Sequence, residues 1–177
     1  MRITRSTLVL SLLLVPALSL GLKLQNDHDD SIDFLNFTTY AWRDGAQVSN
    51  EALHGLIVRS IEGELAKKYL RRIDVNPDLY LTYHASAQEF SIDTSQWGYS
   101  FGPRWQWGGG MGKSTTTVQS YPMGSLVIDL WVAKTQRLAW RGVASDILGD
   151  PSKNAEKAQK AIQDVFANFP PATQNRR

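Results

Sequence analysis

The fold is decided by residues 126–144, which read LVIDLWVAKTQRLAWRGVA. Apolar side chains alternate with other side chains in each half of this stretch, as they do along half-buried β-strands. The polar segment between the halves, residues 133–137, is short enough for a tight turn. We therefore predict a β-hairpin in which Val132 faces Leu138.

This register brings two charged residues together. It places Trp131 opposite Ala139 and Asp129 opposite Arg141. An acid and a base directly opposite each other stabilise an antiparallel pair by roughly 0.2–1 kcal/mol. We therefore predict that Asp129 and Arg141 form a structural cross-strand pair.

Amphipathic helices are expected both before and after this hairpin. The first runs from an N-cap at Ser49 or Asn50 to about Tyr69. The second begins with Asp150 as its N-cap and Pro151 at the first helical position. The apolar stripes are Leu53, Leu56, Ile57, Ile61 and Leu65 in the first helix, and Ala158, Ala161, Ile162, Val165, Phe166 and Phe169 in the second. Each stripe covers one side only, so both helices should lie on a sheet.

The remaining strands are predicted from alternation and composition. Residues 22–26 and 79–87 alternate apolar with polar side chains, and residues 37–42 (FTTYAW) are rich in β-branched and aromatic side chains. We expect the strand at 22–26 to be half-buried and His84 to point to the outer face of the strand at 79–87. Because consecutive strands joined by short loops pair antiparallel, we predict an α+β domain. It has a single antiparallel sheet with both helices packed on one face.

The N-terminus has the three-part layout of a secretory signal peptide. Arg2 and Arg5 precede an almost unbroken apolar run at residues 8–20, and small residues around Ser19 offer cleavage sites. The alternative is an uncleaved membrane anchor. The run is shorter than the roughly 18–20 residues of a spanning helix, and Pro16 interrupts it, which favours cleavage.

The leader sets the expected domain organisation. We expect residues 1–21 to be removed, residues 22–171 to form one domain without a transmembrane segment, and residues 172–177 to be a disordered tail. Without Arg2 and Arg5, the 19 basic residues become 17 and match the 17 acidic ones, so net charge gives no sign of a nucleic-acid partner. The chain has no cysteine, which excludes disulfides and thiol chemistry.

Several segments, in this order, resemble a known bacterial family. They are TYAW (39–42), ELAKK (64–68), PDLYLTYH (77–84), GSLVIDLWVAKTQRLAWRG (124–142) and FPP (169–171). Together they resemble the family filed as domain of unknown function 4136, whose members are mostly envelope lipoproteins. The resemblance covers nearly the whole mature chain. It implies the family's fold and a cell-envelope location, and it implies no activity because the family has none established.

The sequence departs from the family pattern at two places. Lipoprotein members carry a cysteine just after the apolar leader, whereas residues 20–22 here are Leu-Gly-Leu. We therefore expect a periplasmic protein without a lipid anchor. The family also usually has glycine in the hairpin turn where Gln136 stands, and a positive φ there would cost Gln136 on the order of 1 kcal/mol.

Segment 97–114 (WGYSFGPRWQWGGGMGKS) is the main candidate for binding. It gathers large aromatic side chains among glycines, namely Trp97, Tyr99, Phe101, Trp105 and Trp107. Rings of this size are costly to leave in water. They either fold back onto the uncovered sheet face beside Trp131 and Tyr80, or form an exposed surface for a glycan, a lipid headgroup or a partner protein. The binding hypothesis is that these aromatic residues and Trp131 together form the binding surface.

Other motifs for chemistry are incomplete. The run GGGMGKS (108–114) lacks the first glycine of a phosphate-binding loop, because that position is Trp107, and strand-like threonines follow it. The aspartates around His28 complete no known calcium loop. We therefore expect neither a metal nor a cofactor.

The sequence favours recognition over catalysis. Asp129 or Asp146 could approach His84 in space to form part of a Ser-His-Asp site. An envelope hydrolase with a site near His84 is therefore the alternative function. No G-x-S-x-G elbow and no HExxH pair accompanies them in the sequence. We predict a non-catalytic periplasmic binding or scaffolding domain whose partner is an unknown envelope component.

Overall fold

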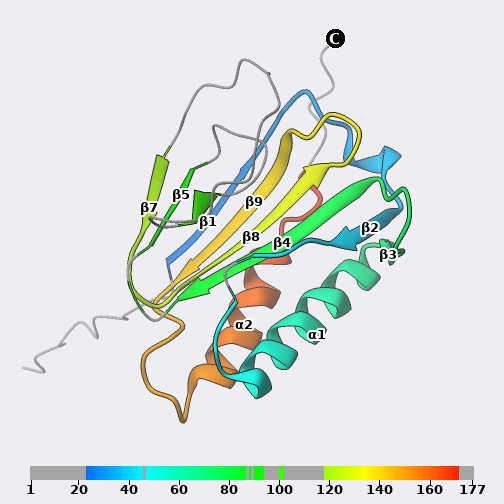
Figure 1. Ribbon diagram of the computed structural model, residues 1–177. Coiled ribbons are helices and arrows are strands. Elements are labelled where there is room, and N and C mark those ends of the chain that lie inside the picture. The colour runs from blue at the N-terminus through cyan, green and yellow to red at the C-terminus, as the bar shows by residue number, and fades with distance from the viewer. Residues whose placement is uncertain are drawn as a thin grey trace, which may run out of the picture.

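The computed structural model of the protein describes residues 23–45, 47–86, 88, 90–93, 100–101 and 118–171. In chain order, the elements within these ranges are β1 (Lys23–His28), η1 (Phe34–Asn36), β2 (Thr39–Trp42), α1 (Glu51–Lys67), β3 (Arg71–Arg72), β4 (Leu79–Ser86), β5 (Phe90–Asp93), β6 (Ser100–Phe101), β7 (Val118–Tyr121), β8 (Ser125–Val132), β9 (Leu138–Ser145) and α2 (Asn154–Phe166). Figure 1 shows their arrangement, with the helices on one side of the strands.

The described strands form two sheets where the sequence predicted one. The larger has six strands in the order β1-β9-β8-β4-β2-β3. β1, β9, β8 and β4 pair antiparallel, whereas β2 pairs parallel with both β3 and β4. The prediction of a purely antiparallel sheet is wrong. From the end of β2, α1 carries the chain back to the side of the sheet where β2 began, and such a crossover makes the next strand parallel. The smaller sheet, again within the described ranges, has the order β6-β5-β7.

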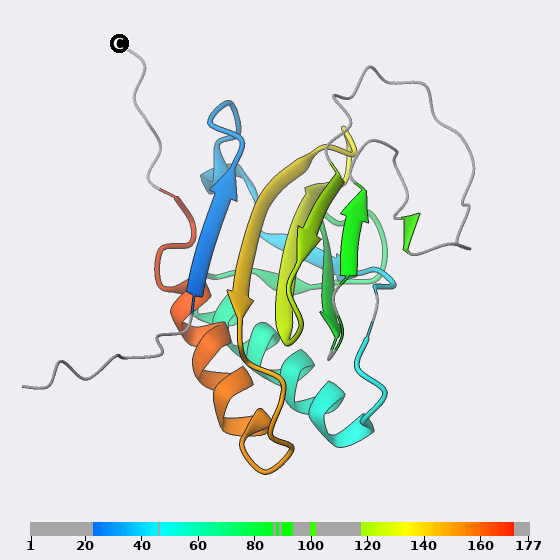
Figure 2. The ribbon, with the colours of Figure 1, turned by 90° about the vertical axis from the view of Figure 1, so that its left-hand side faces the viewer.

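α1 and α2 lie along the same face of the six-stranded sheet, as predicted (Figures 1 and 2). The opposite face was expected to be uncovered, and this expectation is wrong. Ile92 and Tyr121 of the smaller sheet form an apolar cluster with Val127 and Val143 of β8 and β9. The smaller sheet therefore packs on the face that the helices leave open.

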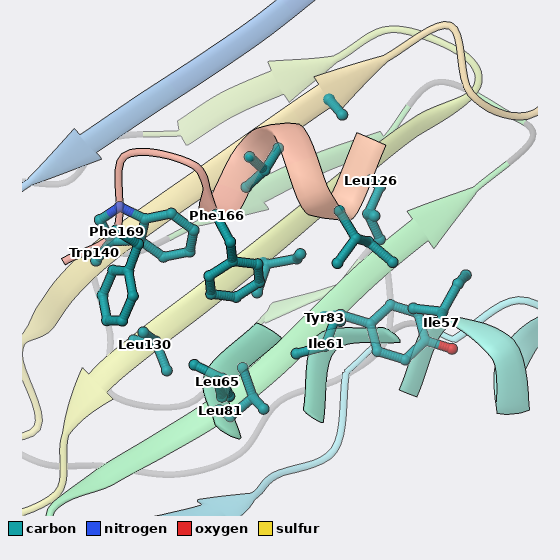
Figure 3. Packing of buried hydrophobic residues seen from close by; sticks show 14 of the residues in the cluster. Ile57, Ile61, Leu65, Leu81, Tyr83, Leu126, Leu130, Trp140, Phe166 and Phe169 are labelled. Carbon is teal, nitrogen blue, oxygen red and sulfur yellow. The ribbon is translucent and has the colours of Figure 1, made fainter. Parts of the chain in front are cut away.

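The main core lies between the helices and the six-stranded sheet (Figure 3). The Trp140 ring of β9 stacks on Phe166 of α2 with centroids 5.1 Å apart, and Phe169 lies 5.0 Å from Trp140. Gly142 leaves the space that this packing needs, because a Cβ there would overlap Val165 and the Trp140 ring. The predicted apolar stripe of α2 is buried along its whole length.

The two helices begin differently from each other. The Asn50 side chain caps α1 by accepting a hydrogen bond from the Leu53 amide at 2.9 Å, as predicted. α2 begins at Asn154, later than predicted. The Asp150 carboxylate accepts hydrogen bonds from the amide and hydroxyl of Ser152 at 3.0 and 2.7 Å. Asp150 therefore closes a turn with its own near neighbour instead of capping the helix.

β8 and β9 form the predicted hairpin with one local difference. Trp131 pairs with Leu138 where the sequence predicted Ala139. The reason is a β-bulge next to Leu130, which inserts an extra residue and shifts the register near the turn. Within the turn, Gln136 has a φ of 63°, the left-handed conformation in which glycine costs least.

β1 lies at one edge of the larger sheet (Figure 2). The sequence predicted a half-buried strand, but all of its side chains are exposed. The difference arises because β1 lies at the sheet edge, where one neighbour is missing from the larger sheet. A hydrogen bond from Asn26 Nδ2 to the Val165 carbonyl oxygen, 3.3 Å long, ties β1 to α2.

Candidate functional site

A group of buried polar side chains lies between the two sheets. It consists of Thr82 and His84 from β4, Asp129 from β8, Arg141 from β9 and Tyr121 from β7, and we call it the intersheet polar cluster. Each of these residues exposes at most 5 % of its surface. Alternation along β4, β8 and β9 points their four members away from the helices, whereas Tyr121 reaches them from the smaller sheet. Strand pairing places Thr82 and Arg141 on either side of Asp129.

The Asp129–Arg141 ion pair is at the centre of the cluster. Arg141 Nε donates to Asp129 Oδ1 at 2.7 Å, and Arg141 Nη2 donates to Asp129 Oδ2 at 2.6 Å. The two parallel hydrogen bonds make this a bidentate pair. Asp129 is 0 % and Arg141 5 % exposed, so the two opposite charges compensate each other where little water can reach them.

Tyr121 links the smaller sheet to this pair. Its hydroxyl accepts a hydrogen bond from Arg141 Nη1 at 3.0 Å, and the guanidinium carbon lies 5.9 Å from its ring centroid. Burial raises the pKa of Tyr121, although the charge of Arg141 partly opposes this shift. The hydroxyl is therefore neutral at physiological pH. Sequence reasoning missed Tyr121, because one tyrosine in a short strand has no pattern that marks it.

The sequence predicted that His84 lies on an open face of the sheet, and this prediction is wrong. The residue is 0 % exposed, and its Nε2 lies 3.4 Å from Thr82 Oγ1. Burial and, to a lesser extent, the charge of Arg141 lower the pKa of His84 to about 3. The imidazole is therefore neutral at physiological pH and is not accessible at the surface.

A second polar group lies between α1 and the strands. The Tyr83 hydroxyl and His54 Nδ1 are 2.5 Å apart, and burial raises the pKa of Tyr83 to about 12. Further along α1, Glu62 accepts hydrogen bonds from Trp42 Nε1 at 2.8 Å and from Arg72 Nη1 at 3.1 Å. These contacts join α1 to β2, β3 and β4. Sequence reasoning missed them, because they connect residues far apart in the chain.

Most of the candidate binding residues lie outside the described part of the chain. Those outside it are Trp97, Tyr99, Trp105 and Trp107, together with the glycine-rich run 108–114. Phe101 is described through its backbone, which pairs with Ile92 in β6 and β5. Trp131 is 8 % exposed and lies opposite Tyr80, whose ring has the Arg43 guanidinium carbon 4.2 Å above it. The binding hypothesis for the aromatic segment stays a prediction.

The acidic segment after β1 is held by local contacts. The Asp29 carboxylate accepts hydrogen bonds from the amide and hydroxyl of Ser31 at 2.9 and 2.6 Å, and it pairs with Arg137. Burial alone would raise the pKa of Asp29, but these hydrogen bonds and the Arg137 charge outweigh it and lower the pKa. Among the described residues, no group of three His, Cys, Asp or Glu side chains is placed to hold a metal ion.

Solved structures show a similar fold. A PDZ domain protein from Parabacteroides distasonis superposes with a TM-score of 0.53 and 20 % sequence identity, over 85 % of this chain and 36 % of that protein. This chain therefore spans about a third of that protein's length, and the likeness shows the fold alone.

Two crystal forms of the PelC dodecamer from Paraburkholderia phytofirmans have TM-scores of 0.46 and 0.48. Their identities are 8 and 7 %, and each match covers 82 % of this chain and 95 % of PelC. These likenesses are too weak to transfer any property.

Family membership follows from the sequence match. No curated protein matches the chain. The family described as Domain of unknown function (DUF4136) matches it over residues 24–171. This match includes every described helix and nearly every residue of the described strands. The chain belongs to the DUF4136 family, which confirms the resemblance seen in the sequence.

Proposed function

We propose that this chain is a non-catalytic binding or scaffolding domain of the bacterial cell envelope. The observation that carries the proposal is the state of the intersheet polar cluster. Asp129 and Arg141 neutralise each other in a bidentate pair, Tyr121 is bound to Arg141, and His84 is neutral and buried. These groups join two sheets, so we assign their polar contacts to the stability of the fold. We assign recognition to residues at the surface.

The proposal includes export to the periplasm. Its support is the leader-like pattern of residues 1–21, with a basic start and an apolar run. No cysteine follows this run, so the proposal takes the mature domain to be free of a lipid anchor. Within the described residues, no helix is long and apolar enough to cross a membrane.

The proposed binding surface is the aromatic segment 97–107. In the chain it lies between β5 and β7, the strands of the smaller sheet, and Tyr121 at the end of β7 bonds to Arg141 of the larger sheet. The strands that flank it in the chain therefore belong to a sheet that is fixed to the larger one. Trp and Tyr rings suit a glycan, a lipid headgroup or a protein surface, because each ring combines an apolar body with a polar handle. The proposal also includes Trp131, which is mostly buried.

Binding to envelope material tests this proposal. The variant replaces Trp97, Tyr99, Trp105 and Trp107 with alanine, and the probe is the total envelope fraction, with membranes and peptidoglycan, in a co-sedimentation assay. We expect the variant to lose at least about tenfold in binding, which corresponds to about 1.4 kcal/mol. Its thermal unfolding midpoint should stay within a few degrees of the native value.

The matched control is Tyr69→Ala. Tyr69 is an aromatic residue at the end of α1 that is 88 % exposed, and its removal should leave binding unchanged. Equal binding by the native chain and the four-residue variant would refute the proposed surface. Unfolding of the variant would instead assign the aromatic residues to the core.

A further inference from the structure

The outer edge of β1 has no partner strand among the described residues. β1 occupies one end of the larger sheet and uses one of its edges for β9, from Lys23 opposite Ser145 to His28 opposite Trp140. All of its side chains are exposed. Its hydrogen bond to α2 through Asn26 holds the strand in place. An ordered, exposed edge of this length is a template for strand addition.

The backbone of β1 decides which registers are possible. The Asp29 amide donates to the Ala139 carbonyl at 3.0 Å, so the odd-numbered residues of β1 direct their backbone polar groups toward β9. In an antiparallel strand these groups alternate from one edge to the other. Leu24, Asn26 and His28 therefore direct theirs outward, and only registers that pair even-numbered residues with even-numbered residues can form hydrogen bonds.

We propose that two copies of this chain pair through β1, antiparallel and with Gln25 on the two-fold axis. In this register Leu24 of each copy exchanges both backbone hydrogen bonds with Asn26 of the other. Lys23 of each copy lies opposite Asp27 of the other, so both charged pairs are complementary. These residues occupy non-hydrogen-bonded positions, where side chains come closest, and opposite charges at such positions are favourable.

The neighbouring registers offer less charge complementarity. A shift in one direction places Lys23 opposite Gln25 and moves Asp27 past the end of β1. A shift in the other direction places Gln25 opposite Asp27, and Lys23 opposite Asp29, which already pairs with Arg137. Charged residues on an edge strand usually prevent pairing, but the spacing of Lys23 and Asp27 makes β1 complementary to itself.

A charge exchange tests the pairing in the intact chain. We expect the native protein to sediment with twice the mass of one chain. Lys23→Glu places two acids opposite each other and Asp27→Lys two bases, so each variant alone should dimerise at least tenfold more weakly. An equimolar mixture of the two variants should recover native dimerisation, because both cross-strand pairs become complementary in the mixed dimer. A native protein that stays monomeric at about 100 μM, or a mixture that does not recover, would overturn the proposal.

Cysteine substitution tests the register, since the native chain has no cysteine. Gln25→Cys brings two thiols together at a pair whose Cα atoms are about 4.5 Å apart, within the range of a disulfide. Lys23→Cys is the matched control, because the two thiols would lie about 13 Å apart along the strands. Only the Gln25→Cys variant should form a covalent dimer, and equal cross-linking of both variants would refute the register. This proposal fails or stands independently of the envelope-binding proposal, which rests on residues 97–107.

Discussion

Replacing Asp129 with alanine tests the buried ion pair between the sheets. In the native protein Arg141 directs Nε and Nη2 at the carboxylate at 2.7 and 2.6 Å, and it is 5 % exposed. Alanine removes both of these hydrogen bonds and the carboxylate charge beside the buried guanidinium. Removal of one partner of such a pair costs about 3–5 kcal/mol. This is a large share of the roughly 5–15 kcal/mol by which a domain is stable.

Urea unfolding at neutral pH, followed by far-UV circular dichroism, measures this loss. We expect the free energy of unfolding to fall by about 3–5 kcal/mol, with an unchanged slope against urea concentration. An exposed ion pair would contribute only about 0.2–1 kcal/mol. A loss below about 1 kcal/mol would therefore refute the conclusion that this buried pair stabilises the domain.

A matched variant separates charge from packing. Asp129→Leu, Arg141→Met and Tyr121→Phe together remove the ion pair and its hydroxyl partner while keeping similar side-chain volumes. Apolar replacement of a buried pair is often neutral or stabilising, so this variant should lie within about 2 kcal/mol of the native protein. A loss as large as that of Asp129→Ala would show that the cost arises from packing.

Three further changes test the turn, the buried imidazole and the helix contact. Gln136→Gly should raise the free energy of unfolding by up to about 1 kcal/mol, because the residue has a φ of 63° and left-handed backbone strains any side chain; a lower urea midpoint would contradict this. His84 has a pKa lowered from 6.5 to about 3 by burial and by the charge of Arg141, so between these pH values the unfolded chain binds a proton that the folded chain does not. Stability should therefore fall by about 1.4 kcal/mol per pH unit below pH 6.5. If the free energy of unfolding of His84→Gln falls with the same slope between pH 6 and 4, the pH dependence arises from another group. Gly142→Ala should cost about 1–3 kcal/mol because its Cβ would overlap α2 and β9 side chains, whereas Gly63→Ala, which has open space in α1, should be neutral or stabilising.

Patterns confined to one segment of the chain predicted structure well. The Asn50 cap, the strand predicted at 79–87 (β4), and the hairpin of β8 and β9 are all present in the structure. In each case, periodicity or a capping residue specifies the element locally. The bulge beside Leu130 was missed because one inserted residue leaves most of the alternation intact.

Pairings between distant segments were not predictable in this way. Nothing in FTTYAW specifies that β2 pairs parallel with β4, because the partner is chosen by the path of α1. The position of His84 has the same explanation. Its strand alternates as though one face met solvent, but the smaller sheet covers that face. The polar residues at Thr82, His84 and Asp129 therefore indicate a buried network instead of a wet surface.

The binding of envelope material by the Asp129→Leu, Arg141→Met, Tyr121→Phe variant tests most directly whether the intersheet polar cluster is structural. This variant lacks the charged side chains of the cluster and keeps segment 97–107. We expect a folded protein that co-sediments with the total envelope fraction as the native chain does. A variant that unfolds at the native urea midpoint but no longer binds would contradict the proposal, because the cluster would then take part in recognition or chemistry.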